Sequence, residues 1–211
     1  MLQKNRSLII GVTGSFGSGK TTVCNIIENK YKVYYTDEMA HKVLNRTDIK
    51  KCLVSRWGEA SIKEGSVDRM YVSNIVFKDK QELDYLNKLI HPQVLKEMQL
   101  IVNLSNEKII FFEVPLLFEL GLERCFDFIL LIKTNIKTKT NRLTKFSGIT
   151  WDEALRRLQT QINDAQKSKM ADKTIINNQN LDKLEAKITD FINSLTSISY
   201  REVLRFDHVM N

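Results

Sequence analysis

The 211-residue chain lacks the features that mark membrane-spanning, disulfide-stabilised and repetitive proteins. No apolar run approaches the ~18 residues of a membrane-spanning helix, and the apolar part of the N-terminal segment MLQKNRSLIIGV is too short for a signal peptide. The three cysteines, Cys24, Cys52 and Cys125, have no metal or redox spacing, which indicates reduced thiols. Internal repeats and low-complexity tracts are absent as well. We therefore expect a soluble cytoplasmic protein without a membrane partner.

The chain has few acidic residues relative to basic ones, and its formal net charge is +7. Such a charge suits either nucleic acid or small phosphorylated substrates. The lysines are scattered, however, and no basic block is interleaved with aromatic residues. Together with the motif described next, this pattern favours phosphate substrates, and we expect no nucleic-acid partner.

The stretch Leu8–Val23, LIIGVTGSFGSGKTTV, contains the uninterrupted pattern G-x-x-x-x-G-K-[ST]. The apolar run Leu8–Val12 predicts a buried strand before it, and the spacing of Val23, Ile26 and Ile27 predicts a helix after it. Glycines in such a loop let the backbone turn tightly and bring its N–H groups close to a polyphosphate. A chance Gly/Ser turn before a lysine is the alternative, and the strand and helix flanks disfavour it.

Each polar residue of this phosphate loop has an expected task. The Lys20 ammonium can reach the β- and γ-phosphates of ATP, and the Thr21 hydroxyl can ligate Mg²⁺, the expected cofactor. The helix that begins near Lys20 also points the positive end of its dipole at the same anion. The expected ATP-binding residues of the loop are Gly14, Gly17, Ser18, Gly19, Lys20, Thr21 and Thr22.

Short apolar runs alternate with helical patterns along the rest of the chain, which predicts an α/β fold with a parallel five-stranded sheet and helices on both faces. The four further strands are expected at 32–35, 108–113, 126–132 and 174–176. The helical block 47–105 is too long for a simple crossover, and it predicts an inserted substrate lobe with a helix break at His91-Pro92. The tail from Ser197 to Asn211 has no clean period, and we expect it to be loosely attached.

We therefore predict one phosphate-loop domain over 1–211 in three parts. Its core comprises 7–46, 106–140 and 170–197, the helical substrate-binding insertion covers about 47–105, and a lid covers about 141–169. The lid is predicted from a basic helix that breaks at Ser147-Gly148 and a second helix that Thr150 caps.

Three residues outside the loop are candidates for chemistry. Asp37 follows the second strand, where α/β folds place their ligands, although it could equally be a helix cap. Glu113 closes the third strand and is a candidate Mg²⁺ ligand, directly or through water. Arg142 lies in a lysine-rich run, and its guanidinium is suited to bind the γ-phosphate as charge spreads during transfer.

Several segments resemble, in order, those of the dephospho-CoA kinase family, a group similar to nucleoside-monophosphate kinases. They are TGSFGSGKTTV in the phosphate loop, TDEMAH at 36–41, LIHP at 89–92, EVPLLFE at 113–119, RLTKFSGITWDEALRRLQTQ at 142–161 and ADKTIINN at 171–178. The resemblance implies ATP-dependent phosphorylation of the ribose 3′-hydroxyl of dephospho-CoA, the last step of coenzyme A synthesis.

The resemblance also implies roles for individual residues. Asp37 falls on the family's acid that accepts or orients the proton of the 3′-hydroxyl, and Lys20 and Arg142 act beside it with Mg²⁺. Asn177 and Asn178 fall where the family holds the adenine of ATP, although a plain turn is equally compatible with them. The implied substrate-binding residues are Asp37, His91, Glu113, Pro115, Leu116 and Leu117. His91 could instead be a structural histidine.

Two positions depart from the family pattern. Tyr35 stands where the family often has an acid, and Phe146 stands where a lid arginine is common. The rival functions are a kinase for a nucleoside, a nucleotide or a shikimate-like acceptor, and a phosphate-loop switch protein without a small acceptor. The apolar segment Pro115–Phe118 favours an acceptor with a long uncharged arm, and we expect a monomer or a weak homo-oligomer.

Overall fold

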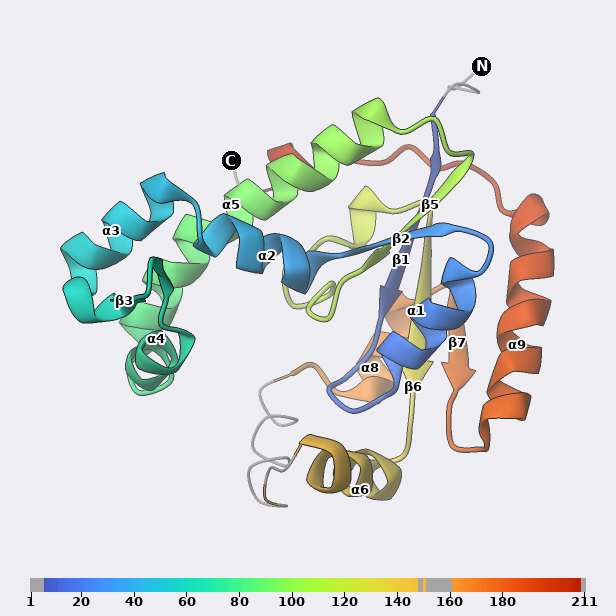
Figure 1. Cartoon of the computed structure of the whole chain (residues 1–211). Coiled ribbons are helices and arrows are strands. Elements are labelled where there is room, and N and C mark those ends of the chain that lie inside the picture. Colours follow the sequence, from blue (N-terminus) through green and yellow to red (C-terminus); the bar gives the residue numbers. More distant parts are fainter. Residues whose placement is uncertain (1–5, 148–149, 151–160, 210–211) are drawn as a thin grey trace. The chain divides into compact units, whose positions relative to one another are not determined.

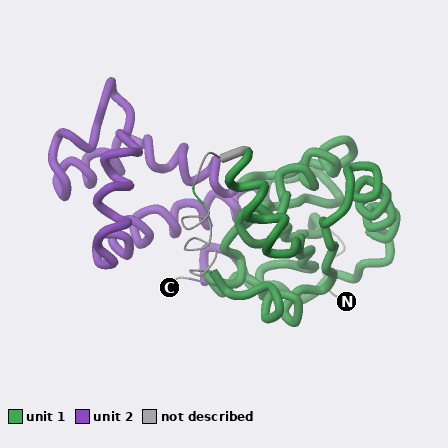
Figure 2. Tube along the Cα trace, turned by 90° about the horizontal axis from the view of Figure 1, so that it is seen from below, with its two compact units in different colours: residues 1–35, 102–205 green, residues 36–101, 206–211 purple. Residues whose placement is uncertain are grey.

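The computed structural model describes residues 6–147, 150 and 161–209, and only the backbone of residues 146 and 147. The chain divides into two compact units. The first unit runs to Tyr35 and resumes over Val102–Arg205, and the second comprises Thr36–Ile101 and the residues from Phe206 onward (Figure 2). Each unit is described by itself below.

A five-stranded sheet forms the centre of the first unit, and every neighbouring pair of its strands is parallel (Figure 1). The strand order is β2-β5-β1-β6-β7. The predicted parallel sheet is therefore confirmed. The strands are β1 (Leu8–Thr13), β2 (Lys32–Tyr35), β5 (Ile109–Glu113), β6 (Phe128–Lys133) and β7 (Lys173–Ile176).

The register of the strands brings their carboxyl ends to one edge of the sheet. Glu113, the last residue of β5, lies opposite both Val12 of β1 and Tyr35 of β2. Thr13 at the end of β1 lies opposite Leu131 of β6. Ligands of parallel sheets bind at this edge, so the register defines where the site of the first unit must lie.

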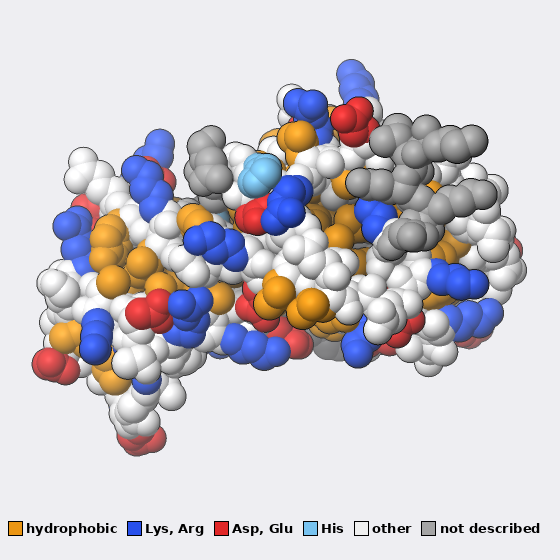
Figure 3. Space-filling model, turned by 90° about the horizontal axis from the view of Figure 1, so that it is seen from above, with side chains coloured by type: hydrophobic (Ala, Val, Ile, Leu, Met, Phe, Trp, Pro, Cys, Tyr) orange, Lys and Arg blue, Asp and Glu red, His pale blue; other side chains and the backbone are white. Residues whose placement is uncertain are grey.

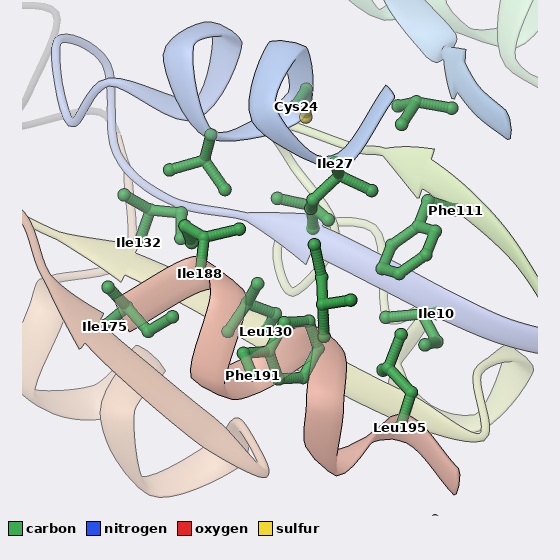
Figure 4. Packing of buried hydrophobic residues seen from close by; sticks show 14 of the residues in the cluster. Ile10, Cys24, Ile27, Phe111, Leu130, Ile132, Ile175, Ile188, Phe191 and Leu195 are labelled. Carbon is green, nitrogen blue, oxygen red and sulfur yellow. The ribbon is translucent and has the colours of Figure 1, made fainter. Parts of the chain in front are cut away.

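Helices α1 (Lys20–Glu28) and α9 (Leu181–Ser194) cover one face of the sheet. Figure 4 shows side chains from both helices meeting those of β1, β5, β6 and β7 in one buried cluster. On the other face, Leu117 and Phe126 are fully buried beside Gly11 of β1. The remaining elements of the unit are η2 (Glu123–Cys125), α6 (Ile136–Ser147), α8 (Asp164–Met170) and η3 (Leu195–Ser197).

The second unit is mostly helical, as predicted for the insertion. Its α4 starts after Asp68, whose carboxylate accepts a hydrogen bond from Tyr71 N at 2.9 Å. A hairpin of two-residue strands around the Glu64-Gly65 turn was not predicted, because such strands are too short for an alternating pattern. The elements are α2 (Thr36–Leu44), α3 (Thr47–Trp57), η1 (Glu59–Ser61), β3 (Ile62–Lys63), β4 (Ser66–Val67), α4 (Arg69–Val76), α5 (Lys80–Leu104) and η4 (Phe206–His208). The last residues of α5 belong to the first unit.

The predicted helix break at His91-Pro92 is wrong, because α5 runs continuously through Pro92. Proline inside a helix removes one backbone hydrogen bond and crowds the preceding turn. Buried apolar side chains on both sides of Pro92, among them Ile90, Val94 and Met98, pack into the unit. Their burial offsets the cost of the proline and keeps the helix in one piece.

The prediction of a loosely attached tail is also wrong. Arg201 N donates to Asp127 Oδ1 at 2.7 Å, and Leu204 N donates to Arg124 O at 2.9 Å. In the second unit, Phe206 is buried and its N–H donates to Gln99 Oε1 at 3.0 Å. Specific hydrogen bonds rather than a helical stripe attach this segment, and such bonds leave no periodic pattern in the sequence.

No described helix combines the length and the apolar character that crossing a membrane requires.

Candidate active site

The phosphate loop joins β1 to α1, and its backbone packs where side chains do not fit. A Cβ on Gly14 would overlap the carbonyl oxygen of Ile132, and one on Gly19 would overlap Asn177 Nδ2. Gly19 also has φ 90°, in the left-handed region, immediately before α1 begins at Lys20. These close approaches explain why glycine is required at two of the predicted positions.

The carbonyl oxygen of Ser18 fixes the middle of this loop to the rest of the unit. It accepts from Asn177 Nδ2 at 2.9 Å and from Thr134 Oγ1 at 3.0 Å, and Arg142 Nη1 lies at 3.5 Å. Asn177 and Thr134 are both buried. The loop is therefore held by the residues that follow β6 and β7, a role of Asn177 that the sequence analysis did not predict.

A cavity of about 250 Å³ lies beside the loop, at the start of α1 and α9. It brings together Gly19, Thr22, Arg142 and Asn177, all predicted for ATP binding or phosphoryl transfer. A cationic guanidinium, amide groups and leucine side chains suit a ligand that carries both a flat ring and phosphate. Three further lining residues were not predicted as part of the site: Gln179, Leu181 and Leu184.

Leu181 could have been found from the sequence. It lies on the apolar stripe of α9, yet its side chain is 52% exposed, unlike the buried Leu184 one turn later. An apolar residue in the first turn of the helix after the last strand lies at the ligand edge of the sheet. Helical periodicity alone does not distinguish such a residue from a core residue, but its position directly after the last strand does.

Lys20 reaches back over the loop toward the end of β5. Its Nζ donates to Gly14 O at 2.9 Å and lies 3.9 Å from Glu113 Oε1. Glu113 is only 6% exposed, so its charge acts on the lysine with little screening by water. The lysine of the phosphate loop and the acid at the end of β5, which were predicted separately, thus lie close together at the sheet edge.

The residues near Lys20 suit a magnesium ion that takes most of its ligands from the phosphate oxygens of a bound nucleotide and from water. Thr21 is exposed in the first turn of α1, and Glu113 supplies a carboxylate 3.9 Å from Lys20. No group of three or more His, Cys, Asp or Glu side chains placed to hold a metal occurs among the described residues. Mg²⁺ in kinases takes one or two protein ligands and obtains the others from phosphate oxygens and water, so this sparse donor set is suitable.

The side chains of the segment after β5, residues 115–117, differ in their exposure to solvent. Leu116 is 39% exposed, Pro115 is half-buried, and Leu117 is fully buried. Thr13 Oγ1 donates to Pro115 O at 3.4 Å and fixes the start of the segment to β1. Leu116 therefore presents the most apolar surface of the three predicted residues.

The second unit carries the other two predicted residues. Asp37 is exposed in the first turn of α2, two residues after β2 ends at Tyr35. His91 is half-buried in α5, and burial lowers the pKa of its imidazole, which favours the neutral form. An exposed carboxylate and a neutral imidazole can each accept a hydrogen bond from a hydroxyl group.

The sequence profile of the dephospho-CoA kinase family matches residues 8–183. The chain belongs to this family. Within it, the dephospho-CoA kinase of Fusobacterium nucleatum is 33% identical over 190 residues, covering 89% of this chain and 98% of that protein. The resemblance read from the sequence segments is thus confirmed.

Solved structures agree with this membership. A crystal structure from Thermus thermophilus has a TM-score of 0.80 at 29% identity and covers 90% of this chain and 99% of that one. The dephospho-CoA kinase from Campylobacter jejuni has a TM-score of 0.68 at 26% identity, covering 90% of this chain and 97% of that one. The predicted fold class, a kinase-type α/β sheet, is confirmed.

One of the two departures from the pattern of the dephospho-CoA kinase family can be placed in the structure. The side chain of Tyr35 hydrogen-bonds that of Glu28 on α1, and burial first, then the neighbouring charges, raises the pKa of its phenol. An acid therefore lies beside Tyr35 although the chain has none at that position. The other departure, Phe146, and residues 147–149 and 151–160 of the predicted lid lie outside the described side chains.

Proposed function

We propose that the chain transfers the γ-phosphoryl group of ATP to the ribose 3′-hydroxyl of dephospho-CoA and releases CoA and ADP. Membership of the dephospho-CoA kinase family supports dephospho-CoA as the phosphoryl acceptor. The observation that carries the proposal is the phosphate loop with Lys20 near Glu113 and a ligand-sized cavity beside it. Phosphoryl transfer depends on positioning and charge neutralisation, and these groups are suited to both.

The residues proposed to bind ATP all belong to the first unit. The cavity receives the adenosine part, between Leu181 and the Arg142–Asn177 side. The loop amides and the start of α1 receive the β-phosphate, where the proposed contacts come from Gly14, Gly17, Ser18, Gly19, Lys20, Thr21 and Thr22. Lys20 and Arg142 stabilise the charge that spreads over the γ-phosphoryl oxygens during transfer.

Magnesium would be held by the Thr21 hydroxyl, with Glu113 acting directly or through water. Bound there with ATP, the ion supplies further neutralisation of the phosphate charge. Lys20 and Arg142 neutralise the remaining phosphate charge.

The acceptor side is proposed to involve Asp37, which accepts or orients the proton of the 3′-hydroxyl, and His91. Leu116 offers an apolar surface for the uncharged arm of the acceptor, and Pro115, Leu117 and Glu113 shape that segment. A kinase for a nucleoside, nucleotide or shikimate-like acceptor remains the rival, and the experiment below separates the two.

We also propose the predicted organisation, with core segments 7–46, 106–140 and 170–197, a substrate insertion at 47–105 and a lid at 141–169. A cytoplasmic monomer or weak homo-oligomer without nucleic-acid or membrane partners is part of this proposal. On the face drawn in Figure 3, Lys and Arg side chains are dispersed among acidic and uncharged ones, which supports small phosphates over nucleic acid.

The test is the release of ADP from Mg-ATP with and without dephospho-CoA, with Lys20→Ala as the blank. We expect turnover that depends strongly on dephospho-CoA, with CoA identified by its mass as the product. A parallel panel contains a nucleoside, a nucleotide and shikimate. Turnover that responds to one of these and ignores dephospho-CoA would overturn the acceptor, whereas slow hydrolysis that no acceptor changes would indicate a switch protein.

A further inference from the structure

Two residues of the phosphate loop, Ser15 and Phe16, are hydrogen-bonded to the segment 161–164, which lies between α6 and β7 in the chain. Ser15 Oγ donates to Asp164 Oδ1, and Phe16 N donates to Gln161 Oε1 at 3.0 Å. Asp164 is the first residue of α8, which Asn163 caps through its own side chain. Two consecutive loop residues are therefore bound to residues 161–164.

Asp164 uses its second oxygen for a cation. Lys139 Nζ, from α6, pairs with Asp164 Oδ2. The Lys139 side chain is 5% exposed and that of Asp164 is 15% exposed, so the pair is largely shielded from water. Both carboxylate oxygens of Asp164 are thus occupied, one by the loop and one by a buried ammonium.

A second ion pair on the same segment provides a comparison. Glu119 Oε1 lies 2.8 Å from Lys167 Nζ and accepts from Ile162 N at 3.0 Å. Lys167 is fully buried. This pair also fixes the segment 161–167, but neither of these two contacts involves the phosphate loop. The pair therefore stabilises the segment without contacting the nucleotide site.

Ser15 connects Asp164 to the lysine of the motif. The carbonyl oxygen of Ser15 accepts from Ser18 N at 3.1 Å, and Lys20 Nζ lies 3.5 Å from it. The same Nζ donates to Gly14 O at 2.9 Å. A change in the orientation of Ser15 therefore moves both the loop amides and an oxygen that directs the Lys20 ammonium.

We propose that Asp164 is a positioning residue for ATP binding and phosphoryl transfer, acting through the Ser15 hydroxyl on the phosphate loop and Lys20. Lys139 is its counter-ion and compensates the buried carboxylate. The inference rests on the proposed function only for the phosphoryl donor, because the contacts concern the ATP side alone. It separates Asp164 from Glu119, whose ion pair is structural.

The test uses two double variants that both remove the buried charges. Lys139→Met/Asp164→Asn keeps an oxygen that can accept from Ser15, and Lys139→Met/Asp164→Leu does not. Buried ion pairs can be replaced by neutral groups at little cost in stability, so both variants should fold with similar Tm values. The ATP dissociation constant is measured without acceptor by displacement of a fluorescent ATP analogue, and KM and kcat are measured with it.

We expect the Asn double variant to keep the ATP dissociation constant within about twofold and the Leu double variant to raise it about tenfold, the effect of one lost hydrogen bond. Ser15→Ala should reproduce the Leu effect, and adding it to the Leu double variant should weaken binding no further. The control Lys167→Met/Glu119→Gln, which neutralises the comparison ion pair in the same way, should leave ATP affinity unchanged.

Equal ATP affinity of the Asn and Leu variants at equal Tm would overturn the proposal, as would full additivity with Ser15→Ala. Because ATP binding is measured without an acceptor, a wrong acceptor assignment would leave this test intact. Failure of the proposed function would appear instead as wild-type protein that binds ATP but ignores dephospho-CoA.

Discussion

The side-chain amide of Asn177 donates to the carbonyl oxygen of Ser18 at 2.9 Å, so the residue that follows β7 holds the phosphate loop directly. Asn177 is 4% exposed, and Arg142 Nη2 lies 3.5 Å from its Oδ1. One buried amide thus links the loop, the last strand and the proposed γ-phosphate cation. This arrangement makes Asn177 a structural part of the nucleotide site rather than only a turn residue.

Asn177→Ala should therefore weaken ATP binding about five- to tenfold, because a buried carbonyl loses a donor at a cost of about 1 kcal/mol or more. Thr134 Oγ1, which also donates to Ser18 O, limits the loss. The measurement is the ATP dissociation constant together with Tm. Asn178→Ala, which removes an exposed acceptor for Asn135 N, should have the smaller effect. Equal effects of the two variants would contradict the linking role.

Asp37→Asn should lower kcat by about 10²-fold or more and leave ATP affinity within twofold, because a positioned carboxylate contributes that much to proton transfer. Glu38→Gln is the matched control, since Glu38 is the neighbouring exposed acid in the first turn of α2. Steady-state kinetics and Tm are measured on both. If activity and stability fell in parallel, Asp37 would be a structural residue of the helix terminus.

Arg142→Ala should reduce kcat about 10²-fold, the usual effect of removing one preorganised donor to developing charge. Arg142→Lys should recover only part of the loss, because an ammonium cannot bind phosphate oxygens bidentately. Lys137→Ala, an exposed cation on the same helix, should leave kcat unchanged. If Arg142→Lys had the kcat of the wild type, Arg142 would contribute to transfer through its positive charge alone and not through bidentate hydrogen bonding.

Local patterns predicted the sheet and the loop, because each depends on a few adjacent residues. Apolar runs predicted the five strands of the parallel sheet within two residues at their ends, and the motif predicted Lys20 beside a phosphate site. The contacts that fix the site join residues far apart in the chain, such as Asn177 with Ser18 and Asp164 with Ser15. No periodicity encodes such pairs, so the sequence could suggest Asn177 only by resemblance and did not suggest Asp164 at all.

The two wrong predictions have the same origin. Pro92 predicted a break from local backbone chemistry, but packing of the flanking apolar side chains keeps α5 continuous. The tail has no helical stripe, but hydrogen bonds to Asp127 and Arg124 attach it. Tertiary contacts override local propensity in both cases, and they are visible only in the structure.

The burial of His91 predicts a pH dependence of stability. Burial lowers the pKa of His91 in the folded state below its unfolded value of about 6.5. The unfolded state therefore binds more protons in this range, and the free energy of unfolding is largest above about pH 6.5 and falls as the pH drops toward the folded pKa. Denaturant unfolding between pH 8 and pH 5 measures it. His91→Gln should flatten this part of the curve, and His41→Gln, at an exposed histidine, should not.

Asp127 organises the attachment of both chain ends to the first unit. Its carboxylate is fully buried, accepts from Ile9 N at 2.8 Å and from Arg201 N at 2.7 Å, and pairs with Arg6 at 2.6 Å. Arg201 also pairs with Asp172 through its guanidinium, but that pair is substantially exposed.

Asp127→Asn should therefore lower the free energy of unfolding by about 3 kcal/mol, because it leaves the Arg6 cation without its buried partner and replaces one acceptor oxygen with a donor. Arg201→Ala should lower it by less than about 1 kcal/mol, because its backbone N–H still binds Asp127 and only an exposed ion pair is lost. Urea unfolding of the two variants makes the comparison. Similar losses would show that the tail is held mainly by the Arg201 guanidinium.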